Sequence, residues 1–275
     1  SHDRRVQMMV GRDISQFYAR KPHEPGEVAL EVKELETPAH LGHKLSFSVR
    51  SGEIVGVAGL VGAGRTEMLH VVFGVDPAVS GTIEVGGKPV QLTSPLDAIR
   101  SGIALAPEDR KQQGIVLEMA VRQNIGLAGL RQHKRKAGFL NNQQEAVDTE
   151  EMIRRLRIKT PSERQIVQYL SGGNQQKVVL GKWLAMKPKV LLLDEPTRGI
   201  DIGAKQEIYS LMEELAEQGV AILFVSSEME EILGMSDRTL VMHEGSITGE
   251  LSRDELSEEA VMQLATGNVA EEAAV

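Results

Sequence analysis

A glycine-rich run at residues 59–66, GLVGAGRT, holds the residues best suited to chemistry. Glycines at this spacing let backbone N–H groups turn toward one point, which suits the oxygens of a phosphate. An apolar segment precedes the run and a helix is expected to open near its end, so the helix terminus adds partial positive charge. We therefore predict a phosphate-binding loop whose contacts are Gly59, Gly62, Ala63, Gly64, Arg65, Thr66 and Glu67.

Arg65 stands where phosphate-binding loops of this spacing carry a lysine. A guanidinium keeps the positive charge but is longer, planar and forked, whereas lysine presents a compact ammonium. Arg65 can therefore hold phosphate and still miss the place that transfer chemistry requires. A glycine-rich turn that binds nothing is the alternative for this run.

Two carboxylates, Asp194 and Glu195, follow the four apolar residues 190–193. A buried strand that ends in an aspartate beside a phosphate loop supplies the second half of a Mg²⁺ site. We expect Asp194 and Thr66 to hold the metal and Glu195 to polarise an attacking water as the catalytic base. The alternative is a strand end whose carboxylates only cap the next turn.

A second polar helix start lies before that strand, at residues 171–174. A serine and two glycines that open a helix again present free N–H groups and a positive dipole end. The expected phosphate contacts are Ser171, Gly172, Gly173 and Asn174. A simple helix cap by Ser171 is the alternative.

The elements that must position these residues follow from the apolar pattern. Strands are predicted at residues 28–32, 45–49, 54–58, 82–85, 103–106, 190–193, 221–225 and 239–242. Helices are predicted near residues 145–156, 174–186, 204–217 and 253–265. Residues 112–188 show no strong strand pattern, so the chain reads as an α/β core with a helical insertion. Residues 1–27 read as a polar lead-in or linker, 28–266 as the main domain and 267–275 as a flexible tail.

The composition narrows the classes of function. The net charge is −8, which argues against a nucleic-acid backbone as the main partner. There is no cysteine, so disulfides and thiolate metal sites are excluded, as suits a cytoplasmic protein. His40 and His43 have metal-like spacing without accompanying ligands, and Trp183 is expected in the core.

The run LSGGNQQK at residues 170–177 resembles the signature motif of ATP-binding cassette (ABC) proteins, with Asn174 in place of glutamine. Residues 194–197 resemble the Walker B segment of that family and residues 199–201 its D-loop. The resemblance implies a P-loop NTPase fold: a RecA-like core, a small antiparallel β lobe and a helical subdomain at about 112–188. It also implies a head-to-tail dimer, in which each ATP with Mg²⁺ lies between one cassette's phosphate loop and the other's signature.

Several positions depart from that family pattern, all in one half-site. Besides Arg65, Glu108 stands where the family has a glutamine near the metal, so Glu108 is an expected metal ligand. Ser227 stands where the family has a catalytic histidine and is the expected catalytic residue there. No clear aromatic residue between 32 and 43 is available to stack on adenine. Losing the histidine contact can cost about 10² in rate. We therefore expect a degenerate site that binds nucleotide and hydrolyses it weakly.

The same departures resemble the second cassette of bacterial monosaccharide importers, in which two cassettes are fused. The segments that carry this likeness are residues 107–115, 62–67 and 9–12. The likeness implies an ATPase that drives sugar import from the cytoplasmic side of the inner membrane. The implied partners are another cassette, membrane permease subunits and, indirectly, a periplasmic sugar-binding protein.

Two alternatives stay open. One is an ATPase that is competent on its own, with Glu195 as base. The other is a soluble ABC protein outside transport, or a structural pairing module. The basic cluster at residues 131–136 is either a solvated face or a contact with lipid or permease.

Overall fold

The computed structural model describes residues 18, 20–130 and 141–267. The basic cluster at 131–136, the segment 9–12 and the tail after residue 267 lie outside the described residues. No helix in the described part is long and apolar enough to cross a membrane.

A six-stranded sheet forms the centre of the molecule, in the order β10-β9-β3-β8-β7-β6. Its strands are parallel except for the β9–β10 pair. The strands at its centre read as unbroken apolar runs because both faces of the sheet are covered. The bounds are β3 (Ile54–Gly59), β6 (Ile103–Ala106), β7 (Val190–Asp194), β8 (Ala221–Val225), β9 (Arg238–His243) and β10 (Ser246–Ser252).

A smaller antiparallel sheet packs beside the first, in the order β2-β1-β4-β5. Its strands alternate buried and exposed residues, as Leu45, Phe47 and Val49 do on β2. Gly86 and Gly87 both have positive φ at the turn between β4 and β5, as a tight hairpin requires. The bounds are β1 (Val28–Glu36), β2 (Lys44–Arg50), β4 (Ser80–Val85) and β5 (Lys88–Val90).

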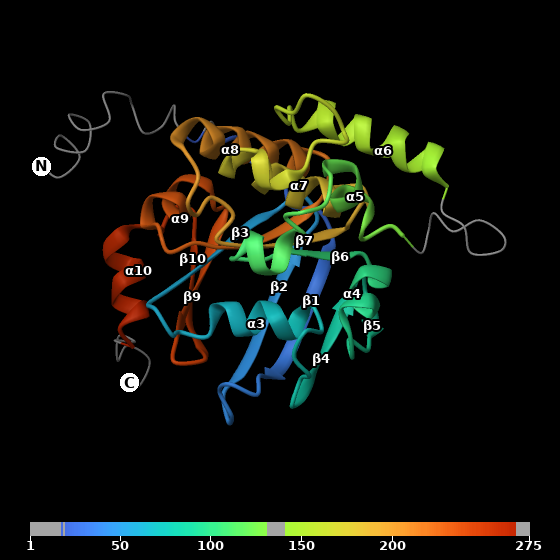
Figure 1. Ribbon diagram of the computed structural model, residues 1–275. Coiled ribbons are helices and arrows are strands. Elements are labelled where there is room, and N and C mark those ends of the chain that lie inside the picture. The colour runs from blue at the N-terminus through green and yellow to red at the C-terminus, as the bar shows by residue number, and fades with distance from the viewer. Residues whose placement is uncertain (1–17, 19, 131–140, 268–275) are drawn as a thin grey trace, which may run out of the picture.

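Helices cover both faces of the central sheet. Figure 1 shows α7 and α8 on one side, and α3 with the antiparallel sheet on the other. Between β6 and β7 the described residues form helices and no strand, as the sequence predicts. The bounds are α3 (Arg65–Val72), α4 (Pro95–Ser101), η1 (Arg110–Gly114), α5 (Val121–Gly126), α6 (Asn142–Arg155), η3 (Val167–Tyr169), α7 (Gly172–Leu184), α8 (Ile202–Glu217), α9 (Met229–Met235) and α10 (Glu258–Ala265).

The predicted helix at 253–265 begins too early. β10 continues to Ser252, and α10 starts at Glu258. The start is set by Ser257, whose hydroxyl accepts a hydrogen bond from the Ala260 N–H at 3.2 Å. The apolar periodicity alone did not separate this cap from the preceding turn.

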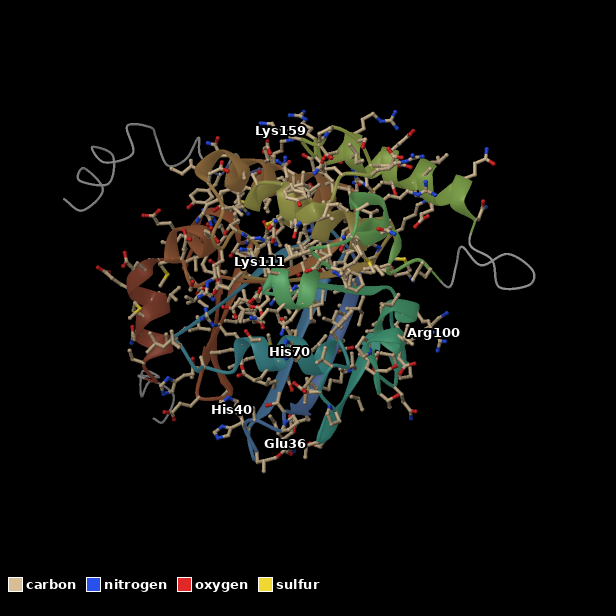
Figure 2. The ribbon with its side chains drawn as sticks, in the orientation of Figure 1. Glu36, His40, His70, Arg100, Lys111 and Lys159 are labelled. Atoms are coloured by element: carbon tan, nitrogen blue, oxygen red, sulfur yellow. The ribbon has the colours of Figure 1, made fainter. Side chains whose placement is uncertain are left out.

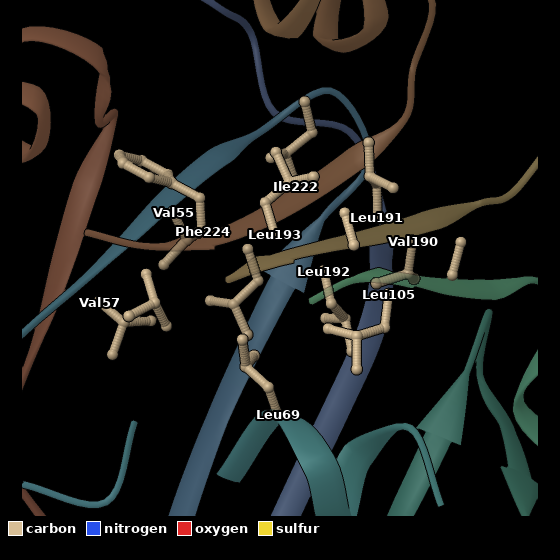
Figure 3. Packing of buried hydrophobic residues seen from close by; sticks show 14 of the residues in the cluster. Val55, Val57, Leu69, Leu105, Val190, Leu191, Leu192, Leu193, Ile222 and Phe224 are labelled. Atoms are coloured by element: carbon tan, nitrogen blue, oxygen red, sulfur yellow. The ribbon is translucent and has the colours of Figure 1, made fainter. Parts of the chain in front are cut away.

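The core forms where α3 meets the central sheet. Figure 3 shows Leu69 of α3 beside the apolar side chains of β3, β7 and β8. Burying a leucine contributes about 2 kcal/mol, so these strand ends are held firmly in place. Trp183 is buried and meets the ring of Phe73 edge-on, at 5.5 Å between centroids, which confirms its place in the core.

The N-terminal strap, residues 20–27, has no strand yet is fastened to the domain by ion pairs. Arg20 pairs with Asp237. The buried ring of His23 lies between two carboxylates, at 3.0 Å from Asp237 and 3.2 Å from Glu213. The strap therefore lies against α8 and the start of β9.

Candidate nucleotide site

The glycine-rich run connects β3 to α3 as the sequence predicts. Gly62 and Gly64 have φ values of 83° and 95°, which L side chains rarely adopt. A side chain at Gly59 would meet the carbonyl of Met242 at 2.5 Å, so only glycine fits there. The loop therefore turns its backbone tightly into the N-terminus of α3, an arrangement that favours anions.

The predicted acidic pair lies at the end of β7. Asp194 is buried, and burial raises the pKa of its carboxyl group, which a hydrogen bond from Thr66 opposes. Glu195 has a φ of 47°, an uncommon conformation for a residue with a side chain. Such strain concentrates at functional sites, where the surrounding structure enforces it.

Ser227 comes to this pair from the end of β8. Its hydroxyl donates a hydrogen bond to the Glu195 Oε2 atom at 3.1 Å. Arg65 reaches the same place, and its Nη1 donates to the backbone carbonyl of Ser226 at 2.8 Å. Burial lowers the pKa of Arg65, while the carboxylates of Glu195 and Asp194 oppose that shift.

The glycine-rich loop, Glu195 and Ser227 line a cavity of about 460 Å³. Its lining is polar and charged, and it combines three strand ends with the start of α3. The lining residues are Val61, Gly62, Ala63, Gly64, Arg65, Thr66, Glu67, Glu108, Glu195, Arg198, Val225 and Ser227. We call this the phosphate pocket.

Glu108 faces the phosphate pocket from the end of β6, where it forms an ion pair with Arg198. Sequence reasoning missed Arg198. Its place three residues after Glu195, in a segment rich in turn residues, was the available signal. Glu108 as a metal ligand stays a prediction, and in this structure its carboxylate is engaged by a cation.

The donor set at the base of the phosphate pocket fits Mg²⁺. The Asp194 Oδ1 atom is buried and lacks a hydrogen-bond partner among the described residues. Thr66 lies beside that carboxylate. Mg²⁺ prefers one or two protein oxygens together with phosphate and water, so a pair of ligands is sufficient. Among the described residues, no three histidine or acidic side chains form a cluster that could hold a metal ion.

The signature start, residues 171–174, is not brought to the phosphate pocket and lies at the N-terminus of α7. Ser171 is exposed, and its hydroxyl accepts from the side chain of Asn174 at 2.9 Å instead of capping the helix. A side chain at Gly173 would meet Ala204 of α8 at 2.4 Å, and one at Gly172 would meet Arg110 at 2.9 Å. The glycines thus allow close packing on Ala204 and Arg110, while Ser171 stays exposed at the start of the helix.

His40, which the sequence singles out only for its spacing from His43, lies beside the phosphate loop. It lies in the β1–β2 connection, near the β9–β10 turn (Figure 2). Its imidazole is the nearest group to a Cβ built on Gly64, at 3.0 Å, and its Cγ lies 2.4 Å from a Cβ built on Gly245. His43 instead contacts Ser246 at 2.7 Å. A planar ring therefore lies beside the phosphate loop, and planar rings are the groups on which nucleotide bases stack.

Comparison with known proteins agrees with this geometry. The sequence pattern of the family described as ABC transporter matches residues 42–198. The chain is 52% identical over 262 residues to the ribose import ATP-binding protein RbsA of Bacillus licheniformis, covering 95% of this chain and 53% of that protein. It is 52% identical over 262 residues to the arabinose import ATP-binding protein AraG 1 of Burkholderia thailandensis, covering 94% of this chain and 52% of that protein. The chain thus spans about half the length of the curated relatives it matches.

Solved structures share the fold. An ATP-binding cassette of an ABC transporter in its ADP conformation has a TM-score of 0.71 at 22% identity, covering 88% of this chain and 100% of that chain. A bacterial Atm1-family ABC exporter with ATP bound has a TM-score of 0.69 at 20% identity, covering 91% of this chain and 43% of that chain. The α/β fold with a parallel central sheet and the match to the family together identify the chain as an ATPase domain of the ABC transporter family.

Proposed function

We propose that this domain couples binding and hydrolysis of ATP to the import of a simple sugar. The support is the sequence identity of 52% to import proteins that are named for ribose and for arabinose. The chain spans about half of those proteins, which supports a place as one of two fused cassettes. We assign it to the second, C-terminal cassette.

The residues of the phosphate pocket would divide the chemistry between them. Backbone N–H groups at Gly62 and Gly64 would bind phosphate oxygens, and Arg65 would balance their charge. Thr66 and Asp194 would hold Mg²⁺, which when bound screens the negative charge of the phosphates. Glu195 would accept the proton of the attacking water at its carboxylate, and Ser227 would orient that carboxylate by its hydrogen bond.

The contact between Ser227 and Glu195 is the observation that favours weak hydrolysis at this site. The short hydroxyl is engaged with the base, whereas an imidazole would reach further into the phosphate pocket. The Arg65 guanidinium already donates a hydrogen bond to the Ser226 carbonyl at 2.8 Å, so one of its donors is used within the protein. Each loss of a placed donor costs about 10² in rate. We therefore propose a binding site with slow turnover.

The signature start supports a second role. Ser171 is exposed and does not cap the helix with its side chain, so the start of α7 would be available to a nucleotide held by another cassette in a head-to-tail dimer. The importer assignment further implies permease subunits as direct partners and a periplasmic sugar-binding protein as an indirect one. It also implies a peripheral position on the cytoplasmic face of the inner membrane. The selectivity for a particular sugar would reside in those partners.

Single-turnover hydrolysis of ATP tests the proposal, with this chain alone and mixed with an intact first cassette. We expect slow hydrolysis alone and a large gain in the mixture. Rapid hydrolysis by the chain alone, abolished by Glu195→Gln, would favour an independently competent ATPase. Co-purification with permease subunits separates transport from other ABC functions.

A further inference from the structure

A buried carboxylate outside the phosphate pocket holds several of the pocket's segments together. Glu231 of α9 is 1% exposed. Its Oε1 atom accepts hydrogen bonds from Thr197 and Tyr209, both at 2.5 Å, and from the Lys205 ammonium at 3.2 Å. Its Oε2 atom accepts from the hydroxyl of Ser226 at 2.7 Å. One side chain thus gathers four donors.

These donors come from the segments that build the phosphate pocket. Thr197 follows the acidic pair at the end of β7, and Ser226 comes directly before Ser227 at the end of β8. The other two donors lie on α8. Glu231 therefore ties two neighbouring strand ends to each other and to one helix.

The link continues into the phosphate pocket through the backbone of Ser226. While its hydroxyl is held by Glu231, its carbonyl accepts the hydrogen bond from Arg65 at 2.8 Å. The next residue, Ser227, contacts Glu195. A shift of the end of β8 would therefore move the Arg65 guanidinium and the Glu195 carboxylate together.

The groups around Glu231 hold its carboxylate in one position. Burial alone would lower the pKa of Lys205, but hydrogen bonds to Glu228 and Glu231 raise it. Tyr209 also packs against the buried ring of Tyr18, at 5.1 Å between centroids, which fixes its hydroxyl. A buried carboxylate with these partners is costly to displace.

We propose that Glu231 is a positioning residue for the triphosphate: through Ser226 it fixes where the guanidinium of Arg65 lies. This inference rests on the proposed function, because it requires that the phosphate pocket hold ATP. The cationic side chain at this loop position, usually a lysine, reaches the β- and γ-phosphates, and we expect the Arg65 guanidinium near the same phosphates. Displacing it should then weaken ATP more than ADP.

The test compares Glu231→Gln with Glu213→Gln in the full chain. Glu213 is a matched control because it is also a buried carboxylate, but it contacts the N-terminal strap. Titration calorimetry gives dissociation constants for ADP and for a non-hydrolysable ATP analogue. We expect Glu231→Gln to weaken the analogue about tenfold and ADP less than about twofold, as loss of one charge-assisted contact implies. Glu213→Gln should leave the ratio of the two constants unchanged.

Equal losses for both ligands, or an equal change of the ratio in Glu213→Gln, would overturn the role of Glu231 while leaving ATP binding intact. If the unmodified chain binds neither nucleotide, the proposed function is wrong, and the inference about Glu231 is then wrong as well. Should Glu231→Gln not fold, Tyr209→Phe removes a single donor and keeps the ring. We expect it to weaken the analogue about threefold, and an unchanged constant would contradict the inference.

Hydrogen exchange supplies a readout that needs no nucleotide. Glu231→Gln should speed exchange in residues 195–199 and 226–228, which Glu213→Gln should not. Unchanged exchange in those segments would show that Glu231 does not hold them.

Discussion

The phosphate pocket and the signature start are both built on helix N-termini, yet they differ in how they are assembled. The phosphate pocket draws residues from the ends of β6, β7 and β8 and from the start of α3, around about 460 Å³. The signature start is a few consecutive residues at one end of α7, with Ser171 exposed. The phosphate pocket therefore depends on the tertiary arrangement of several strands, whereas the signature start is formed by residues adjacent in sequence.

This difference explains how the two regions tolerate change. The phosphate pocket is shaped by strand ends, so we expect that shape to tolerate the proposed departures from the family pattern at Arg65, Glu108 and Ser227. The signature start keeps two adjacent glycines because neighbouring atoms fill the space beside them. Its chemistry, however, requires a phosphate supplied from outside the chain. The predictions below test that asymmetry.

The largest effect is expected from Ser171→Arg in a mixture with an intact first cassette. A long cation on the exposed helix start would block its approach to phosphate, and steady-state ATP hydrolysis should fall about 10³-fold. Arg65→Ala should lower it less than about threefold. Ser162→Arg, at another exposed serine, is the control. Equal damage from the changes at 171 and 65 would contradict the asymmetry.

A pH effect on stability should arise from the helix that carries the signature start. Burial lowers the pKa of Lys182 from 10.5 to about 8. Below pH 8 the lysine is charged in both states and its burial costs stability. Between pH 8 and 10.5 the folded state releases its proton while the unfolded chain keeps it, so stability rises with pH.

Two contacts favour the charged form of Lys182 in the folded state and so reduce the rise in stability with pH. Lys182 donates to the Gly114 carbonyl at 2.6 Å and lies 4.7 Å from the centre of the Trp183 ring. We expect a gain of about 2 kcal/mol in the free energy of unfolding across this window. Denaturant titrations of the parent and of Lys182→Met measure it as a difference. A variant with the same pH profile as the parent would refute the assignment.

Two glycine substitutions compare the packing of the two regions directly. A methyl group at Gly173 would meet Ala204 at 2.4 Å and push α7 away from α8, at about 1.5 kcal/mol. A methyl group at Gly62 would meet nothing within 4 Å, and its cost of about 1 kcal/mol comes only from the positive φ. Chemical denaturation should therefore rank Gly173→Ala as the more damaging. The reverse order would mean that the phosphate loop is the more tightly packed region.

The smallest effect concerns the ring beside the phosphate loop. His40→Ala should weaken ATP about fivefold, since stacking on a base contributes about 1 kcal/mol. Fluorescence titration with a nucleotide analogue measures this, with His43→Ala as the matched control. If the two variants bind alike, the base does not rest on His40.

Most of the fold could be predicted from the sequence because its central strands are buried on both faces. Such strands appear as apolar runs that need no tertiary context to recognise. β5 has only three residues and contains Pro89, and the face of β10 is partly exposed, so neither gives that signal. The start of α10 depended on one capping serine.

The candidate site was predictable to the extent that it is contiguous in sequence. The phosphate loop, the acidic pair and the signature start are short runs. Arg198 and His40 lie beside them only through tertiary contacts, and Glu231 acts on the phosphate pocket through other residues. For Arg198 the only sequence signal was its place shortly after Glu195, and for His40 and Glu231 the spacing gave no indication of this position.

The N-terminal strap also determines how far any upstream domain could range. Because His23 is buried between two carboxylates and Tyr18 is buried against Tyr209, these two residues are fastened to the domain and do not serve as a free tether ahead of β1. That removes about 33 Å of reach, the span of roughly ten extended residues. A shorter tether raises the effective concentration of two linked domains, so fastening the strap would favour their pairing without adding a contact between them.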